Sequence, residues 1–216
     1  MPDIASPSAS TLNPAKTARQ RTDTFTSIWM MIAVAMAIAA LVAKSRMPQP
    51  LWTMIHLVTL GVLSNGIFQW SWFFARSLAR MSADDPRARR HNTIRVLIFN
   101  AFFASLFVSM WLGWMVGTVI AATGIAAVAA WHGAEMLSVL RERLASRFVI
   151  VVRYYVCSAS FFVLAALLAS FVTVTMFSPS IPEAMVAMRD RLTLAHALSG
   201  VAGWVGLTIG GTVITL

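Results

Sequence analysis

The sequence is poor in charge and in cysteine. Charged residues make up 12% of its 216 residues, and acidic residues number 8 against 17 lysines and arginines. The single cysteine, Cys157, cannot form an internal disulfide, and no CxxC or CxxCH motif is present to bind a metal or attach haem covalently. The sequence also has no glycine-rich phosphate loop, no nucleophile elbow and no HExxH zinc motif. It therefore carries no signature of a soluble enzyme.

Apolar residues, by contrast, are abundant. They make up 58% of the chain, and the mean hydropathy is +0.74. The apolar share is above that of an ordinary soluble domain, and the charged share is well below it. A net charge of +9 would suggest nucleic-acid binding in a soluble protein, but here the basic residues lie between apolar runs. We therefore expect an all-α integral membrane protein that contacts lipid and binds no nucleic acid.

Six apolar segments are long enough to cross a bilayer, whose hydrocarbon core of about 30 Å needs roughly 20 helical residues. They cover residues 25–43, 51–75, 96–115, 118–140, 148–177 and 192–216. The third and fourth are divided at "WLGWMVGT", where glycine and tryptophan predict an interfacial hairpin. Residues 1–24 are rich in serine, proline, threonine and alanine and predict a disordered tail. The expected organisation is this tail followed by a six-helix domain over residues 25–216.

The basic residues predict the direction of each crossing, because short loops rich in lysine and arginine stay cytoplasmic. One side would hold Lys16, Arg19, Arg21, Arg76, Arg80, Arg87, Arg89, Arg90, Arg95, Arg141, Arg143, Arg147 and Arg153. The other would hold Lys44, Arg46, Arg189 and Arg191. We expect both termini to be cytoplasmic, in a bacterial inner membrane. No basic residue follows the sixth segment, so either the chain stops flush with the membrane or it is a module cut from a longer polypeptide, which we favour. His91 lies among the arginines of the second loop and is expected to be solvated.

Two histidines are predicted to lie at matching depth near the outer surface. His56 follows the start of its segment by five residues and His196 by four, and both segments run inward. Their imidazoles are placed to serve as two axial ligands of one b-type haem, or as ligands of copper. Ionisable residues within a bilayer are costly and usually functional. Small residues follow His196 on one face and leave room for a macrocycle or for close helix packing. They are Ser199, Gly200, Gly203 and Gly210.

A second polar level is predicted nearer the cytoplasm. Glu135 is the one acidic residue inside a predicted span, and it follows His132 by three residues, so both point from one helix face. Arg153, Tyr154 and Asn100 lie at comparable depth. We expect Glu135 and Arg153 to pair in an inner-leaflet pocket able to hold a quinol headgroup, a haem propionate or a proton path, with His132 as base or ligand. The alternative is that Arg153 reaches the surface and Glu135 lies among hydrated headgroups.

Two stretches, "HLVTLGVLSNGIFQWSWFFARSL" and "RLTLAHALSGVAGWVGLTIGGTVITL", with "WHGAEML" and "VRYYV" between them, carry a resemblance. Together they resemble the six-helix membrane module that precedes copper nitrite reductase or multicopper oxidase domains in some bacterial proteins. More distantly, they resemble haem-copper membrane proteins of the nitric-oxide-response type. The resemblance implies a membrane redox module that takes electrons from quinol and passes them to a copper-containing domain or protein. It also implies His56, His132 and His196 as haem or metal ligands.

The sequence has no histidine-rich cupredoxin segment, so a copper domain would lie beyond Leu216 or on a partner. An enzymatic role stays open, and it would at most be the quinol-oxidising or electron-transfer part of an oxidoreductase. Two other functions also remain open. One is a proton-coupled transporter in which Glu135, His132 and Arg153 relay protons or bind an anion, and the other is a structural or assembly module without a cofactor. An inverted repeat would favour the transporter, but the one repeated spacing, from His56 to Gly66 and from His196 to Gly206, joins two segments that run the same way.

Overall fold

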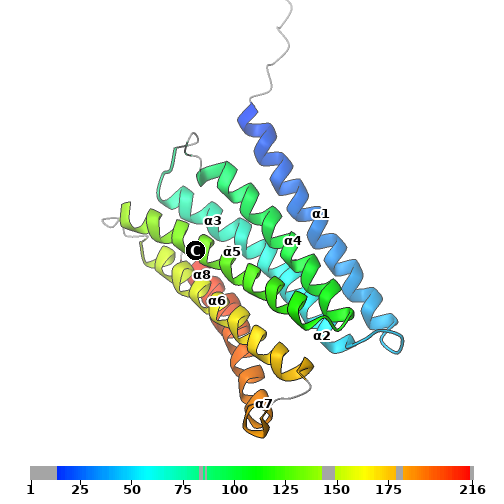
Figure 1. Cartoon of the computed structure of the whole chain (residues 1–216). Helices are drawn as coiled ribbons and strands as arrows, with labels where there is room; N and C mark the ends of the chain where they lie inside the picture. Colours follow the sequence, from blue (N-terminus) through cyan, green and yellow to red (C-terminus); the bar gives the residue numbers. More distant parts are fainter. Residues whose placement is uncertain (1–13, 83–84, 86, 143–148, 179–181, 215–216) are drawn as a thin grey trace, which may run out of the picture.

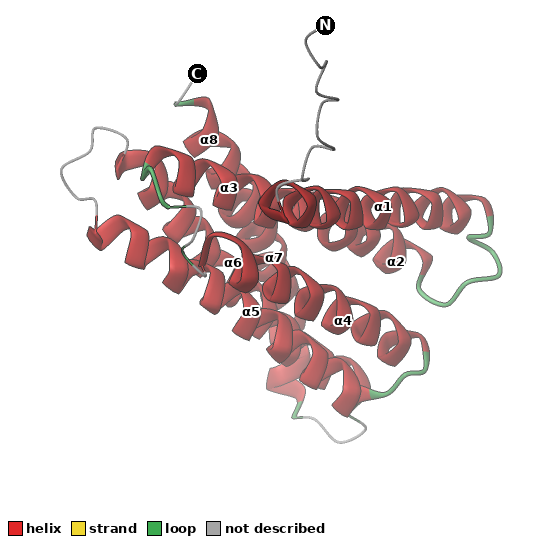
Figure 2. Ribbon diagram, turned by 90° about the horizontal axis from the view of Figure 1, so that it is seen from above, coloured by secondary structure: helices red, strands yellow, loops and turns green. Residues whose placement is uncertain are grey.

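The computed structural model of the chain describes residues 14–82, 85, 87–142, 149–178 and 182–214, and none of these forms a β-strand (Figures 1 and 2). In chain order the helical elements are α1 (Pro14–Val42), α2 (Pro50–His56), η1 (Leu57–Ser64), α3 (Asn65–Leu78), η2 (Arg87–His91), α4 (Asn92–Trp111), α5 (Met115–Glu142), α6 (Val149–Phe177), α7 (Glu183–Leu198), η3 (Ser199–Gly206) and α8 (Leu207–Val213). The three η elements are π-helical.

Six helical spans in the described chain are long and apolar enough to cross a membrane, which confirms the predicted number. They are Thr24–Val42, Pro50–Leu78, Asn92–Trp111, Met115–Glu142, Ile150–Phe177 and Glu183–Val213. Span two is therefore made of α2, η1 and α3, and span six of α7, η3 and α8. The direction of insertion stays a prediction, and "inner" and "outer" below follow it.

The predicted hairpin between the third and fourth spans is confirmed. Helix α4 ends at Trp111 and α5 begins at Met115, so three residues make the turn. Gly113 has a φ of +65°, in the left-handed region that glycine adopts at little cost. Glycine is therefore well suited to the position where the chain reverses.

Two helix starts differ from the predicted ones. Helix α1 begins at Pro14, so residues 14–24, expected in a disordered tail, are helical, whereas residues 1–13 lie outside the described part. Helix α7 begins at Glu183, well before residue 192, and places Arg189 on a helix instead of a loop. Pro182 precedes α7 and an acidic residue occupies its first turn, and both are helix-start signals. The Arg189 guanidinium donates hydrogen bonds to the backbone carbonyl and hydroxyl of Thr175 at the end of α6.

Helix α5 packs against both α4 and α6, and α6 in turn carries α7, η3 and α8 (Figure 1). Helix α1 lies at the edge of the bundle against η1 and leaves most of its span exposed. The core between these helices is rich in aromatic side chains, among them Phe68, Phe99, Phe103, Phe162 and Trp204. Exposed apolar side chains cover the outside, as expected for a surface in lipid.

The small residues of span six allow α6 to approach closely. A Cβ added at Gly203 would lie 2.5 Å from the Cβ of Phe161, and one added at Gly211 would lie 2.7 Å from the Cβ of Tyr154. Real Cβ atoms do not approach so closely, so alanine would not fit at either position without movement. Of the two roles considered for these residues, close helix packing is the one that the structure shows for Gly203.

Candidate functional site

The structure brings His56 and His196 together from α2 and α7. Their ring centroids lie 6.0 Å apart, and the ring planes are inclined by only 9°. Both side chains are partly buried. Two histidines separated by 140 positions in the sequence therefore form one pair, which is the juxtaposition that their predicted depths require.

Backbone carbonyls orient both imidazoles. Nδ1 of His56 lies 2.8 Å from the carbonyl oxygen of Trp52, and Nδ1 of His196 lies 2.8 Å from that of Ala165 on α6. A carbonyl oxygen only accepts, so each Nδ1 carries the hydrogen and each Nε2 keeps a free lone pair in the neutral ring. Among the described residues, neither Nε2 has a protein hydrogen bond. This is the orientation typical of metal-ligating histidines.

The separation of the two rings is close to the one that two axial ligands of one iron require. A metal–nitrogen bond of about 2.0–2.1 Å and about 1.1 Å from each nitrogen to its ring centre would place two opposed ring centres about 6.2–6.4 Å apart. The observed separation is 6.0 Å. The haem macrocycle supplies the other four ligands, so two imidazoles suffice. A copper site generally uses more protein donors, and no group of three histidine, cysteine, aspartate or glutamate residues gathers within the described chain.

The surroundings of the pair differ on its two sides. The Trp52 ring stacks on His56 at 4.3 Å and contacts Phe107 at 5.1 Å, which ties α2 to α4. Helix α7, all of which is described, has no fully buried side chain and packs mainly on α6 and η3. His196 is therefore carried by a helix whose apolar surface is still largely uncovered.

A π-helical segment lies next to each histidine. Segment η1 begins directly after His56, and η3 begins three residues after His196. Such segments occur frequently at functional sites, because the extra residue in the turn alters how the helix presents its side chains. The same order of histidine and π-helix in spans two and six gives a structural counterpart to the repeated spacing seen in the sequence.

His132 does not join this pair. Its Nε2 lies 3.0 Å from the Ser71 hydroxyl, and its ring meets Phe68 edge-on at a centroid distance of 4.8 Å. Ser71 follows His56 by 15 residues in span two, which corresponds to about 20 Å along a helix. His132 therefore lies at the inner polar level, where the sequence predicted it, and its role as a haem or metal ligand stays a prediction.

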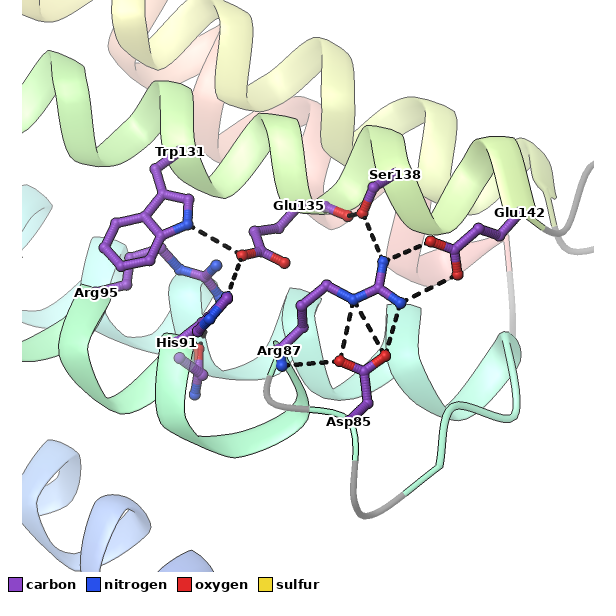
Figure 3. Close-up of polar contacts among 9 residues, drawn as sticks. Asp85, Arg87, His91, Arg95, Trp131, Glu135, Ser138 and Glu142 are labelled. Carbon is purple, nitrogen blue, oxygen red and sulfur yellow. Dashed lines mark hydrogen bonds and ion pairs between the residues drawn. The ribbon is translucent and has the colours of Figure 1, made fainter.

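The inner polar cluster exists, but its members differ from the predicted ones. Oε1 of Glu135 accepts hydrogen bonds from Nδ1 of His91 at 2.8 Å and from Nε1 of Trp131 at 3.0 Å (Figure 3). The predicted Glu135–Arg153 pair is wrong, because the Arg153 side chain is exposed. His91, expected to be a solvated loop residue, is instead the partner of the buried carboxylate.

Arg95 also belongs to the inner polar cluster, and its position differs most from the predicted one. We placed it in a loop, but its side chain is 0% exposed in the second turn of α4. Its guanidinium carbon lies 5.0 Å from the Trp72 ring, and Nη2 donates to Oδ1 of Asn92 at 2.9 Å. It also interacts electrostatically with Glu135 and His132. The sequence could have indicated a helical position, because Arg95 directly precedes the apolar stretch "VLIFN" of α4.

The other residues predicted to line the inner-leaflet pocket, Asn100 and Tyr154, instead contact neighbouring helices. Asn100 and Asn65 exchange two side-chain hydrogen bonds of 2.8 and 3.0 Å, so their amides satisfy each other. Tyr154 packs beside Gly210 and Gly211 of α8. Neither the Asn65–Asn100 hydrogen bonds nor the packing contacts of Tyr154 involve Glu135.

An ion-pair network braces the inner end of the bundle. Arg87 binds Asp85 at 2.6 Å and reaches Glu142 at the end of α5 at 2.6 Å and Ser138 at 3.0 Å (Figure 3). The hydrogen bonds from Arg87 hold the pKa of Asp85 below its usual value, and the two carboxylates raise the pKa of Arg87. The second loop is thereby fastened to α5 beside the inner cluster.

Aromatic side chains separate the two polar sites. From Trp52 beside His56, successive ring contacts run inward to Phe68 beside His132. The rings between them are Phe107, Phe103 and Phe99. We refer to Phe68, Phe99, Phe103 and Phe107 as the aromatic layer, which keeps the outer and inner sites apart.

The six spans and their apolar outer surface indicate the class of the chain, a multi-pass α-helical membrane protein. Comparison with known proteins adds no family to this: no protein-family model, no curated protein and no solved structure matches the chain. Function is therefore argued from the site geometry.

Proposed function

We propose that the chain is a membrane electron-transfer module that holds one b-type haem between His56 and His196. The observation that carries the proposal is the pair of nearly parallel imidazoles, 6.0 Å apart, whose Nδ1 atoms are both engaged by backbone carbonyls. A haem with two histidine ligands exchanges single electrons at its iron.

The chain's own residues would prepare the site. The carbonyls of Trp52 and Ala165 hold each ring in one tautomer, which directs both Nε2 lone pairs away from the backbone. The Trp52 ring restricts rotation of His56 by stacking on it. Such orienting partners typically change metal affinity by 10–100-fold when they are removed.

The direction of electron flow rests on the resemblance in the sequence. We propose quinol as the donor and a copper-containing redox domain or protein as the acceptor. The predicted topology supports an outward acceptor, because it places the histidine pair near the outer end of spans two and six. Copper bound by the same pair is a weaker alternative, because two imidazoles supply fewer donors than copper sites usually contain.

An optical spectrum of the purified full chain in detergent tests the proposal. Reduced protein supplied with haem should show a sharp α band that His56→Ala and His196→Ala each abolish. His91→Gln is the matched control, because it changes a histidine at the opposite end of the bundle and should keep the band. Folded protein that stays colourless with ample haem would remove the proposal.

The angle between the two rings gives a second readout. Axial imidazoles inclined by only 9° predict a rhombic low-spin ferric signal in electron paramagnetic resonance. A strongly axial signal, typical of perpendicular rings, would show that the iron is not held by this pair as it stands.

A further inference from the structure

Five polar atoms of the inner cluster lie buried without a hydrogen-bond partner in the described chain. They are Nε1 of Trp72, Nε and Nη1 of Arg95, Nδ1 of His132 and Oε2 of Glu135. A buried polar atom without a partner destabilises the fold, and more so where the group is charged. A cluster that only stabilised the fold would be expected to satisfy these atoms, as the Asn65–Asn100 pair does.

The hydrogen bonds of His132 define which of its nitrogens is free to accept. The Ser71 hydroxyl donates its hydrogen to the carbonyl of Ile67 at 2.6 Å, so its oxygen accepts from Nε2–H of His132 at 3.0 Å. In the neutral ring Nδ1 therefore carries no hydrogen and presents a lone pair. This lone pair and Oε2 of Glu135 are two unused proton acceptors three residues apart on one face of α5.

The titratable groups become steadily more buried from the inner surface toward the core. The His91 side chain is 39% exposed, that of Glu135 is 9% exposed, and His132 is fully buried. His91 and Glu135 are joined directly at 2.8 Å. We propose that His91, Glu135 and His132 form a proton-transfer pathway that enters the bundle at its arginine-rich end and stops at His132.

The proton moves in two steps. Protonated His91 passes the hydrogen on Nδ1 to the Glu135 carboxylate, which leaves a neutral imidazole and a neutral carboxylic acid. The carboxyl group of Glu135 then rotates so that the proton received on Oε1 faces the core, and a water molecule that enters transiently passes it to Nδ1 of His132, which restores the carboxylate. The buried Arg95 guanidinium belongs to the same cluster, and its positive charge repels a proton on His132.

A small cation or anion fits these atoms less well than a proton does. An anion would face the two unused acceptors, and a metal cation would face the Arg95 guanidinium. The unpartnered atoms are all buried, so the cluster is closed to bulk water in this structure. Beyond His132 lie Phe68 and the other rings of the aromatic layer, which offer no proton acceptor. The pathway therefore ends at His132.

Infrared spectroscopy of the haem-free full chain in lipid tests this inference independently of the proposed function. Acidification should produce the band of a protonated buried carboxyl group, and Glu135→Gln should remove it. In D₂O this band should shift at least tenfold more slowly in His91→Gln, because glutamine still donates to Glu135 but cannot relay a proton. Glu142→Gln changes an exposed carboxylate nearby and should leave the exchange rate unchanged.

Nitrogen NMR of the protein with labelled histidine tests whether the proton reaches His132 at the inner end of the pathway. The His132 signal should respond to a pH step at least tenfold more slowly in Glu135→Gln than in the wild type. The inference is overturned if no buried carboxyl band appears, if the band exchanges equally fast in His91→Gln, or if His132 responds equally fast without Glu135. Glu135→Asp keeps a carboxyl group and should restore the fast response of the His132 signal. Such rescue would show that the slow response of Glu135→Gln does not come from disturbed folding.

Discussion

Replacing Gly203 by alanine tests the close contact that positions span six on α6. The added Cβ would lie 2.5 Å from both Cβ and Cγ of Phe161. Rotation of the Phe161 side chain moves its ring but not its Cβ, so the two backbones must separate. Overpacking of this kind costs about 1–3 kcal/mol. Alanine regains about 1 kcal/mol through its higher helix propensity, so the net loss of stability should be at most about 2 kcal/mol.

Gly210→Ala is the matched control, because Gly210 lies on the same span. The nearest atom to its added Cβ is Cε1 of Tyr154 at 4.0 Å, which is an ordinary contact. The helix-propensity gain is therefore expected without overpacking, and this variant should be about as stable as the wild type or up to about 1 kcal/mol more stable. The two glycine variants should differ by about 1–3 kcal/mol, since the propensity term is common to both.

Reversible unfolding of both variants in mixed detergent micelles measures this difference. His196 lies seven residues before Gly203 on the same continuous helical span. Displacement of η3 should therefore also weaken the haem α band in Gly203→Ala and leave it intact in Gly210→Ala. Equal unfolding free energies for the two variants would refute the close approach of η3 to α6.

Two further predictions concern polar contacts. Asn65→Leu should lower stability by about 1–3 kcal/mol because it leaves Oδ1 of the buried Asn100 without its hydrogen bond, although Nδ2 still donates to Val96. The double leucine variant should lose less than the sum of the two single variants. Additive losses in an unfolding double-mutant cycle would contradict this. The pKa of Asp85 is lowered in the folded state by Arg87, so its contribution to stability is present above the ordinary value of 3.8 and is lost as pH falls through the lower folded value. This contribution should stay below about 1 kcal/mol, because the pair is near the surface. Between pH 6 and pH 3 the free energy of unfolding should fall less in Asp85→Asn than in the wild type. An equal fall in both proteins would count against the ion pair.

Periodicity and length were enough to predict the spans. Apolar runs of about 20 residues must form helices in a bilayer, because the backbone polar groups have no water to bond there. The turn at Gly113 was predictable for a similar local reason, since glycine interrupts the apolar run where the chain has to reverse. The early start of α7 was missed because Arg189 and Arg191 look like loop residues, although a proline and an acidic residue mark the true start.

The depth of each polar residue also follows from the sequence alone, because it depends only on counting residues from the end of a span. This is why the meeting of His56 and His196 was within reach of sequence reasoning. The rotation of each helix about its axis is not contained in such counting. Glu135 could have faced α6, where Arg153 lies, but it faces α4 and pairs with His91.

The sequence by itself thus determined an all-helical chain with six spans and two levels of polar groups, since hydrophobic length and rise per residue are local properties. Only the tertiary structure decided which side chains meet at each level. Those contacts depend on how side chains from different helices interlock, as where Phe161 fills the space beside Gly203 and Arg95 lies over Trp72. Interlocking of that kind is a property of several distant segments at once.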